Sequence, residues 1–261
     1  MSASPTKSQN DQFDRIIASA GKKARKGLDR EAHTRFGKRR GEFDKGLDAL
    51  VKRLAAPTPD YTLARSILGG DFISPEEIMT ARPGIIYSDD QIAALADMMP
   101  SEEALRWCKD NGFAVVAAPP RALSLLNIRM LEADLFYSKT GGWYAEANQK
   151  FASDDKTSVG WLMIRKTDVP KSHSKNWTEQ SALLSNVEYV PNAAKMSWFI
   201  TTFYKVRGIR LFENVCVRTS SVDANGDRVC LGCFDAGGLV VSGYWGDVRD
   251  DYLGVASGRK A

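Results

Sequence analysis

The chain has 261 residues, 43% hydrophobic and 26% charged, a balance typical of a globular protein with one large domain and room for an appendage. It has no apolar run long enough to span a bilayer and no basic-then-apolar signal peptide, so we expect a cytoplasmic protein. Display by a nonclassical route and association with a phage particle stay open as alternatives. The net charge of +4 is uneven, because residues 15–53 hold thirteen Lys or Arg against five Asp or Glu.

Residues 1–58 are expected to form a basic arm, partly helical or disordered. An apolar stripe at helical spacing predicts an amphipathic helix near its end, formed by Phe43, Leu47, Leu50, Val51 and Leu54. The segments GKKARKG and RFGKRRG before it are too rich in glycine and charge to favour a strong helix. The arm is interpreted as a solvated linker helix or a self-association stem; the alternative is a nucleic-acid contact through residues 15–53. The cations of that alternative are Lys22, Lys23, Arg25, Lys26, Lys38, Arg39 and Arg40.

The Pro-punctuated stretch APTPDY at 56–61 predicts a boundary between this arm and a body at 59–261. Ser74, Ser88 and Ser101 each precede an acidic turn and predict the starts of three helices. Further along the chain we expect helices at 177–185 and 191–206. Strands are expected at 113–119, 135–137, 160–164, 209–212, 215–219, 229–234, 239–241 and 252–256. Helices in the first half and strands at the end predict an α+β fold.

Catalytic motifs are missing from the sequence. There is no GxSxG elbow, P-loop, HExxH or Rossmann fingerprint, and the paired carboxylates such as Asp89-Asp90 are adjacent, so their side chains diverge. Cys230-x-x-Cys233 lacks a second ligand pair, and alternation along a strand would place its two thiols on opposite faces. We therefore expect a protein that is not an enzyme and holds no metal or cofactor. Turnover that disappears on Cys230→Ser would favour an enzyme instead.

The C-terminal stretch from Arg228 to Lys260 mixes two kinds of position. One kind looks like a rigid frame, rich in glycine and large apolar residues: Gly232, Phe234, Asp235, Gly238, Leu239, Trp245, Leu253, Gly254, Val255 and Ala256. Of these, Phe234, Leu239, Trp245 and Leu253 are expected to anchor the loops in the core. The other kind lies between the frame residues and follows no structural pattern: Cys230, Cys233, Val240, Ser242, Gly243, Tyr244, Gly246, Val248, Asp250 and Tyr252.

The segment VRTSSVDANGDRVCLGCFDAGGLVVSGYWGDVRDDYLGVASGRK resembles the C-terminal variable region of target proteins diversified by diversity-generating retroelements. Upstream, ARPGIIYSDDQ, FYSKTGGWY, GWLMIRK, WTEQ and PNAAK resemble the body of the same proteins. The resemblance covers roughly residues 70–261 and leaves out the basic arm. It implies a C-type-lectin-like fold of the branch related to the formylglycine-generating enzyme, with a variable region at about 228–260.

The resemblance implies a non-enzymatic binding protein whose ten interleaved positions contact an unidentified protein or other macromolecular ligand. Template adenines copied with errors turn AAC or AAT codons into NNC or NNT, which never encode Lys, Glu, Gln, Met or Trp. None of those five residue types occurs at the ten positions. Tyr244 and Tyr252 are expected to be the strongest contact residues. Formylglycine-type catalysis is not implied, because Cys230 and Cys233 fall at variable positions. Calcium binding is not implied either, because no EPN- or QPD-type triad is present.

Overall fold

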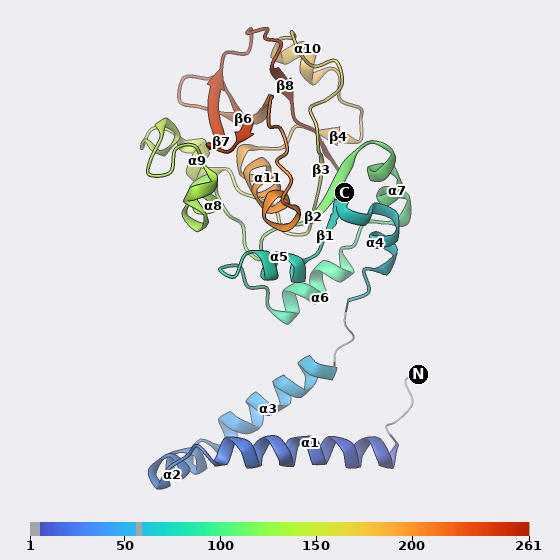
Figure 1. The fold of residues 1–261 in the computed structure, drawn as a ribbon, viewed down its shortest axis with the longest axis vertical. Coiled ribbons are helices and arrows are strands. Elements are labelled where there is room, and N and C mark those ends of the chain that lie inside the picture. Colours follow the sequence, from blue (N-terminus) through green and yellow to red (C-terminus); the bar gives the residue numbers. More distant parts are fainter. Residues whose placement is uncertain (1–5, 56–58, 261) are drawn as a thin grey trace. The chain divides into compact units, whose positions relative to one another are not determined.

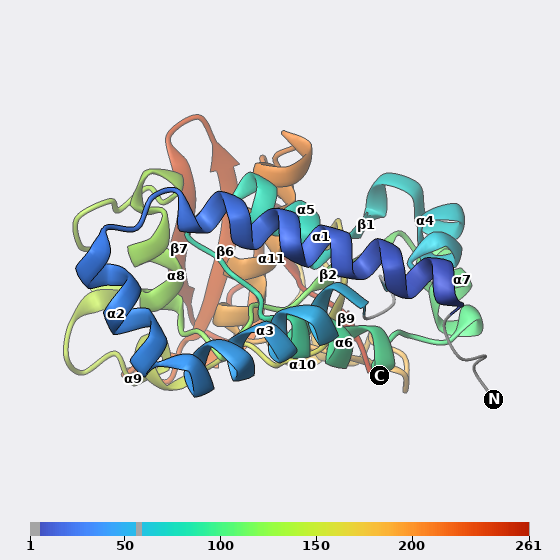
Figure 2. The same ribbon diagram turned by 90° about the horizontal axis from the view of Figure 1, so that it is seen from below.

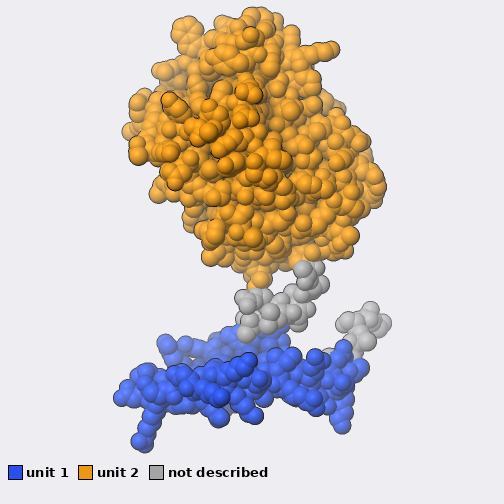
Figure 3. All heavy atoms as spheres, viewed as in Figure 1, with its two compact units in different colours: residues 1–58 blue, residues 59–261 orange. Residues whose placement is uncertain are grey.

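A computed structural model describes residues 6–55 and 59–260; of residues 48–50 and 52–55 it describes only the backbone. The chain divides into two compact units, residues 1–58 and residues 59–261, which Figure 3 colours separately. Each unit is described by itself. No helix in the described ranges is long and apolar enough to cross a membrane.

Unit 1 consists of three helices joined by short turns, α1 (Lys7–Arg25), α2 (Arg30–Lys38) and α3 (Arg40–Ala55), drawn in blue in Figure 2. Unit 1 is more helical than its glycine-rich segments predicted. The first turns of α1 and α2 are each stabilised by an N-terminal cap. Thr6 and Gln9 form a capping box at the start of α1, and the Asp29 side chain accepts from the Ala32 amide at the start of α2. None of the residues whose side chains are described here is buried, and the predicted stripe is seen only in part, since Leu50 and Leu54 lie outside them.

Unit 2 opens with four helices: α4 (Thr62–Leu68), α5 (Pro75–Ala81), α6 (Asp89–Asp97) and α7 (Glu102–Asp110). Ser74 and Ser88 form the predicted capping boxes with Glu77 and Gln91, and Ser101 accepts from the Ala104 amide. The helix starts read from these serines are therefore confirmed. α7 ends before Gly112, whose φ of +73° requires the left-handed backbone that glycine adopts without strain.

The first sheet has five strands in the order β1-β2-β3-β9-β4. They are β1 (Phe72–Ile73), β2 (Phe113–Ala117), β3 (Trp161–Arg165), β4 (Glu188–Tyr189) and β9 (Gly258–Arg259). β2 is buried along its whole length, as its continuous apolar run predicts. The last strand of the chain, β9, returns to pair antiparallel with both β3 and β4.

The long helix α11 (Ala193–Arg207) lies at the centre of unit 2, against α5 and α8 (Leu125–Leu131) and against strands of both sheets (Figure 1). It begins where the Asn192 side chain accepts from the Lys195 amide and ends at Gly208, with φ of +70°. Its residue Trp198 is fully buried and donates from Nε1 to the Ala117 carbonyl of β2 at 3.0 Å. One helix thereby joins residues of both sheets in the main core.

The second sheet is built from the C-terminal residues, in the order β7-β6-β5-β8. Its strands are β5 (Cys216–Val222), β6 (Arg228–Asp235), β7 (Gly238–Tyr244) and β8 (Leu253–Val255). β5, β6 and β7 are antiparallel neighbours, whereas β8 pairs with β5 in parallel. Residues 245–252, the crossing loop, connect β7 at one edge of the sheet to β8 at the other. Two sheets and many helices make unit 2 a mixed α+β fold, as predicted.

Two strand predictions are wrong. Residues 133–135 form a 3-10 turn and Phe136 makes a single bridge to Leu239, so no strand forms at 135–137. No strand forms at 209–212 either: residues 209–210 have no regular structure and residues 211–214 form a turn, with a φ of +58° at Phe212. In both segments the apolar side chains of Phe136, Leu211 and Phe212 are buried, so hydrophobicity reflected core packing and not sheet pairing.

Candidate ligand-binding surface

The second sheet has one face in the core and one face beneath the crossing loop. Val217, Leu231 and Val241 lie in register across β5, β6 and β7 and belong to the main core. The next register row, Arg218, Cys230 and Ser242, points to the opposite side. We call this side the outer face. The outer face carries a small apolar cluster of Cys216, Cys230 and Leu253. Val248 of the crossing loop packs against this cluster.

Arg218 is the central contact between the outer face and the crossing loop. Its side chain is fully buried, and its guanidinium donates from Nη2 to the carbonyls of Trp245 at 3.0 Å and Val248 at 2.8 Å. From Nη1 it donates to the Lys175 carbonyl at 3.1 Å and to Gln180 Oε1 at 2.8 Å. Burial lowers the pKa of Arg218, yet a guanidinium stays protonated in proteins. The charge is therefore stabilised by carbonyl dipoles.

Main-chain groups hold the rest of the crossing loop. The Trp177 amide at the start of α10 (Trp177–Ser181) donates to the Gly246 carbonyl at 2.8 Å, and the Ser174 amide donates to Asp250 at 2.8 Å. The Cys216 amide of β5 donates to the Tyr252 carbonyl at 3.0 Å. With the two bonds from Arg218, five carbonyls of the loop accept from donors outside the loop. None of these donors belongs to the ten interleaved positions.

Most of the ten interleaved positions reach the surface. Tyr252 is 39% exposed. Eight others are half-buried: Cys233, Val240, Ser242, Gly243, Tyr244, Gly246, Val248 and Asp250. Cys230 is different, since it is fully buried in the middle of the sheet between β5 and β7. It therefore does not lie on the surface where we expected it.

The glycines fall into two groups that match the frame and the interleaved sets. A β-carbon at Gly232 would lie 2.1 Å from the Val215 carbonyl oxygen, and one at Gly238 would lie 2.6 Å from the backbone of Phe136 and Tyr137. At Gly254 it would meet Asp168 Cβ at 2.6 Å. The nearest atom to a β-carbon at Gly246 is 3.7 Å away, and at Gly243 it is 3.3 Å away, a side-chain oxygen. Of these five glycines, the three frame glycines are the ones that close packing requires.

Three of the expected frame anchors lie in the core, and one does not. Phe234, Leu239 and Leu253 are buried. Trp245 is 70% exposed, so its prediction as a core anchor is wrong. Trp245 follows the last residue of β7, and its main-chain carbonyl, not its side chain, is the group held by Arg218. Its exposed indole contributes to the surface.

Aromatic and charged side chains gather along the crossing loop. The hydroxyls of Tyr244 and Tyr252 are 2.7 Å apart, and their rings meet edge-on with centroids 6.2 Å apart. Burial raises the pKa of Tyr244, so its hydroxyl stays protonated and can exchange its hydrogen bond with a ligand. At the rim, Arg249 makes two bonds to Glu179, at 2.6 and 2.9 Å. Such a surface suits binding by aromatic and polar contacts.

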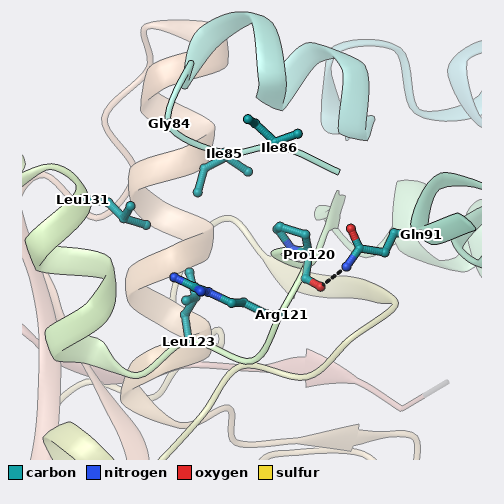
Figure 4. A pocket seen from close by; sticks show the side chains of 8 residues that line it. All are labelled: Gly84, Ile85, Ile86, Gln91, Pro120, Arg121, Leu123 and Leu131. Carbon is teal, nitrogen blue, oxygen red and sulfur yellow. Dashed lines mark hydrogen bonds between the residues drawn. The ribbon is translucent and has the colours of Figure 1, made fainter. Parts of the chain in front are cut away.

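The part of the chain that the structure describes contains no group of three His, Cys, Asp or Glu side chains that could hold a metal ion. The pocket in Figure 4, of about 310 Å³, is lined by Ile85, Ile86, Leu123, Leu131 and neighbouring residues, with Arg121 as its charged group. It shares no residue with the predicted sites.

The seven arm cations predicted for nucleic acid are all exposed on unit 1. Arg39 and Arg40 are close to Glu42 and Asp44, at 3.5 and 3.8 Å. Among the described residues no carboxylate lies within ion-pair distance of the other five, which are Lys22, Lys23, Arg25, Lys26 and Lys38. The end of α1 therefore carries a compact positive charge.

The sequence did not identify Arg218 and Gln180 as part of this surface. Gln180 is fully buried and donates from Nε2 to the carbonyls of Ser172 and Leu253, at 2.8 and 2.9 Å. The one available signal was an arginine between Val217 and Thr219 in a predicted strand, where an unpaired buried charge would be costly.

No family model, curated protein or solved structure matches this chain.

Proposed function

We propose that this protein is a non-enzymatic binding protein of the kind diversified by retroelements, with a C-type-lectin-like unit 2 that recognises a macromolecular ligand. The main support for the proposal is the way the crossing loop is held. Donors outside the loop fix its carbonyls, and main-chain bonds do not depend on the identity of the side chains. Side chains on such a loop can change while the backbone keeps its course.

The surface chemistry supports binding of a protein or another macromolecule. Tyr244, Trp245 and Tyr252 offer large amphipathic areas that lose little conformational entropy when a ligand binds. The half-buried Val240 and Val248 add apolar area, and Asp250 and Arg249 add charge. Aromatic residues together with arginine and polar groups are typical of protein interfaces.

A formylglycine-type oxidase is disfavoured by the state of its candidate cysteine. Burial raises the pKa of Cys230 to about 12, and the thiol is fully buried in the sheet. A thiol that is protonated, closed off from solvent and bonded to the Arg228 carbonyl is a poor nucleophile toward a substrate from solvent. We therefore assign Cys230 a packing role in the outer face.

The DNA that flanks the gene tests this proposal. Copying from a template requires a near-repeat of the segment that encodes residues 228–260, beside a gene for a reverse transcriptase. We expect both, with adenines in the template at the codons of the interleaved positions that reach the surface. The codon of Cys230 provides an internal comparison with the codons of the surface positions. Its side chain is fully buried, so a substitution there would have to fit the core of the sheet.

A second function, nucleic-acid binding through residues 15–53, is favoured by the cations at the end of α1, which have no described carboxylate within ion-pair distance. Binding through phosphate contacts weakens steeply as salt rises. A plot of log K against log salt concentration falls with a slope of about 0.9 for each phosphate contact. In the full chain, replacing Lys22, Lys23, Arg25 and Lys26 by Gln should reduce that slope by roughly three to four units.

Titration of a fluorescent oligonucleotide at several salt concentrations measures this slope. Lys166→Gln provides the control, because Lys166 lies in unit 2 and pairs with Asp71 at 2.8 Å. This substitution should leave the salt dependence of binding unchanged. A slope unaffected by the fourfold change would contradict the nucleic-acid function. A dimeric mass of the full chain that is lost on Phe43→Ser would instead assign the arm to self-association.

A further inference from the structure

Two cysteines of the outer face lie within reach of a covalent bond. Cys216 Sγ of β5 and Cys233 Sγ of β6 are 3.1 Å apart. A regular strand would not bring them together, because Cys233 follows Gly232, the register partner of Cys216, and would point into the core. The register shifts between Gly232 and Asp235, and this bulge turns the Cys233 side chain toward Cys216.

The backbone conformation at the bulge is unusual for a residue with a β-carbon. Gly232 has a φ of +148° and Cys233 a φ of +45°, one of four non-glycine residues with positive φ among those described. The strained turn is held by the Cys233 amide, which donates to Val215 at 3.0 Å, and by the Phe234 amide, which donates to Phe212 at 3.2 Å. Such outliers often occur at sites with a function.

The two thiols differ in access. Cys233 is half-buried, whereas Cys216 is buried, and burial raises the pKa of the Cys216 thiol. An oxidant from solvent therefore reaches Cys233 first. Cys216 lies behind it, in position to react with an oxidised Cys233 sulfur. This is the arrangement of a peroxide-reactive cysteine beside its resolving partner.

We propose that Cys216 and Cys233 form a modification site that a hydroperoxide converts into an intramolecular disulfide. Cys233 Sγ attacks one oxygen of the peroxide, the O–O bond breaks, and a sulfenic acid and water (for hydrogen peroxide) result. Cys216 Sγ then attacks the sulfenic sulfur, the S–O bond breaks, and the oxygen leaves as a second water with the Cys216 proton. Two thiols are oxidised by two electrons, and one peroxide is reduced to two waters.

The other two cysteines are placed differently. Cys230 belongs to the same cluster, but its thiol donates to the Arg228 carbonyl at 3.4 Å and is fully buried. Cys108 lies in a separate core cluster beside Phe113. Neither sulfur lies against another as those of Cys216 and Cys233 do. The expected bridge therefore has one defined pairing.

The bridge would tie the bulge of β6 to β5 directly beneath Tyr244 and Val248, which pack on this cluster. Oxidation would thus fix one side of the outer face covalently. The inference stands apart from the proposed binding function, since it depends only on the two sulfurs and their backbone. Any effect on a ligand would come through the surface residues that lie over the pair.

The test uses the full chain, reduced, freed of reductant, treated with one equivalent of hydrogen peroxide and then alkylated with N-ethylmaleimide under denaturing conditions. We expect the number of alkylated thiols to fall from four to two, with a peptide that joins Cys216 to Cys233. The mass before alkylation should fall by about 2 Da, and dithiothreitol should restore it. Cys230→Ser and Cys108→Ser should form the same bridge, whereas Cys233→Ser should not.

Three results would overturn the inference. They are four alkylated thiols after treatment, a joined peptide with another pairing, and a Cys233 that gains two oxygens without forming a bridge. Peptide mapping of the unmutated chain detects all three. The outcome therefore does not depend on whether a serine variant folds.

Discussion

Replacing Arg218 by Met should release the crossing loop and lower the free energy of unfolding by about 3 kcal/mol. Met keeps much of the apolar stem but removes the donors to the Trp245 and Val248 carbonyls, the Lys175 carbonyl and Gln180 Oε1. Each buried acceptor left without a donor costs about 1–3 kcal/mol, partly offset because the buried charge is also removed. Urea denaturation measures the loss of stability. Hydrogen exchange should show faster exchange of the amides at 245–252.

Arg249→Met provides the matched control. Arg249 lies in the same loop and carries the same charge, but its guanidinium is half exposed and pairs with Glu179 at the surface. Exposed ion pairs contribute little to stability, so the urea midpoint should stay close to that of the unmutated chain. If Arg218→Met and Arg249→Met behaved alike, Arg218 would not be the residue that holds the loop.

Gly232→Ala should be among the most damaging single substitutions in the chain, with a loss of about 4 kcal/mol or more. Its β-carbon would lie 2.1 Å from the Val215 carbonyl oxygen, and this neighbour is backbone that cannot rotate away. The φ of +148° adds strain for any residue other than glycine. Thermal and urea unfolding, together with the soluble yield, measure the effect.

Gly246→Ala is the comparison from the interleaved set. The nearest atom to its β-carbon is Trp177 Cβ at 3.7 Å, an ordinary contact, and its φ lies outside the positive range. We expect a change within about 0.5 kcal/mol. Equal losses at Gly232 and Gly246 would contradict the division of the C-terminal residues into a frame and a replaceable set.

The sequence predicted elements best where the signal was local. Ser74 and Ser88 lie three residues before a Glu or Gln that completes the cap, so those helix starts depended on no distant contact. The prediction of a strand at 209–212 was wrong because Leu211 and Phe212 are buried although they lie in a turn. A short apolar run does not show whether its residues pair with a strand or only pack in the core.

The exposure of most interleaved positions agrees with the sequence interpretation, but the contacts that hold the crossing loop were not predictable. The sequence analysis placed Gly232 and Gly238 in the frame and Gly246 among the interleaved positions, and the close packing at the first two agrees with that division. The acceptors of Arg218 lie at positions 175, 180, 245 and 248, and three of them are main-chain carbonyls that have no sequence signature. The bulge at Cys233 defeated the alternation rule in the same way, since one extra residue reverses the face of a side chain.

Sequencing the DNA around this gene would show whether the surface is diversified by copying from a template. We expect a near-repeat of the segment for residues 228–260 next to a reverse transcriptase gene. Differences between the two copies should occur at template adenines and be confined to codons of surface positions such as Tyr244, Val248 and Tyr252. A genome without such a repeat, or a repeat whose differences fall on Gly232, Gly238 and Leu253, would contradict a diversified binding surface.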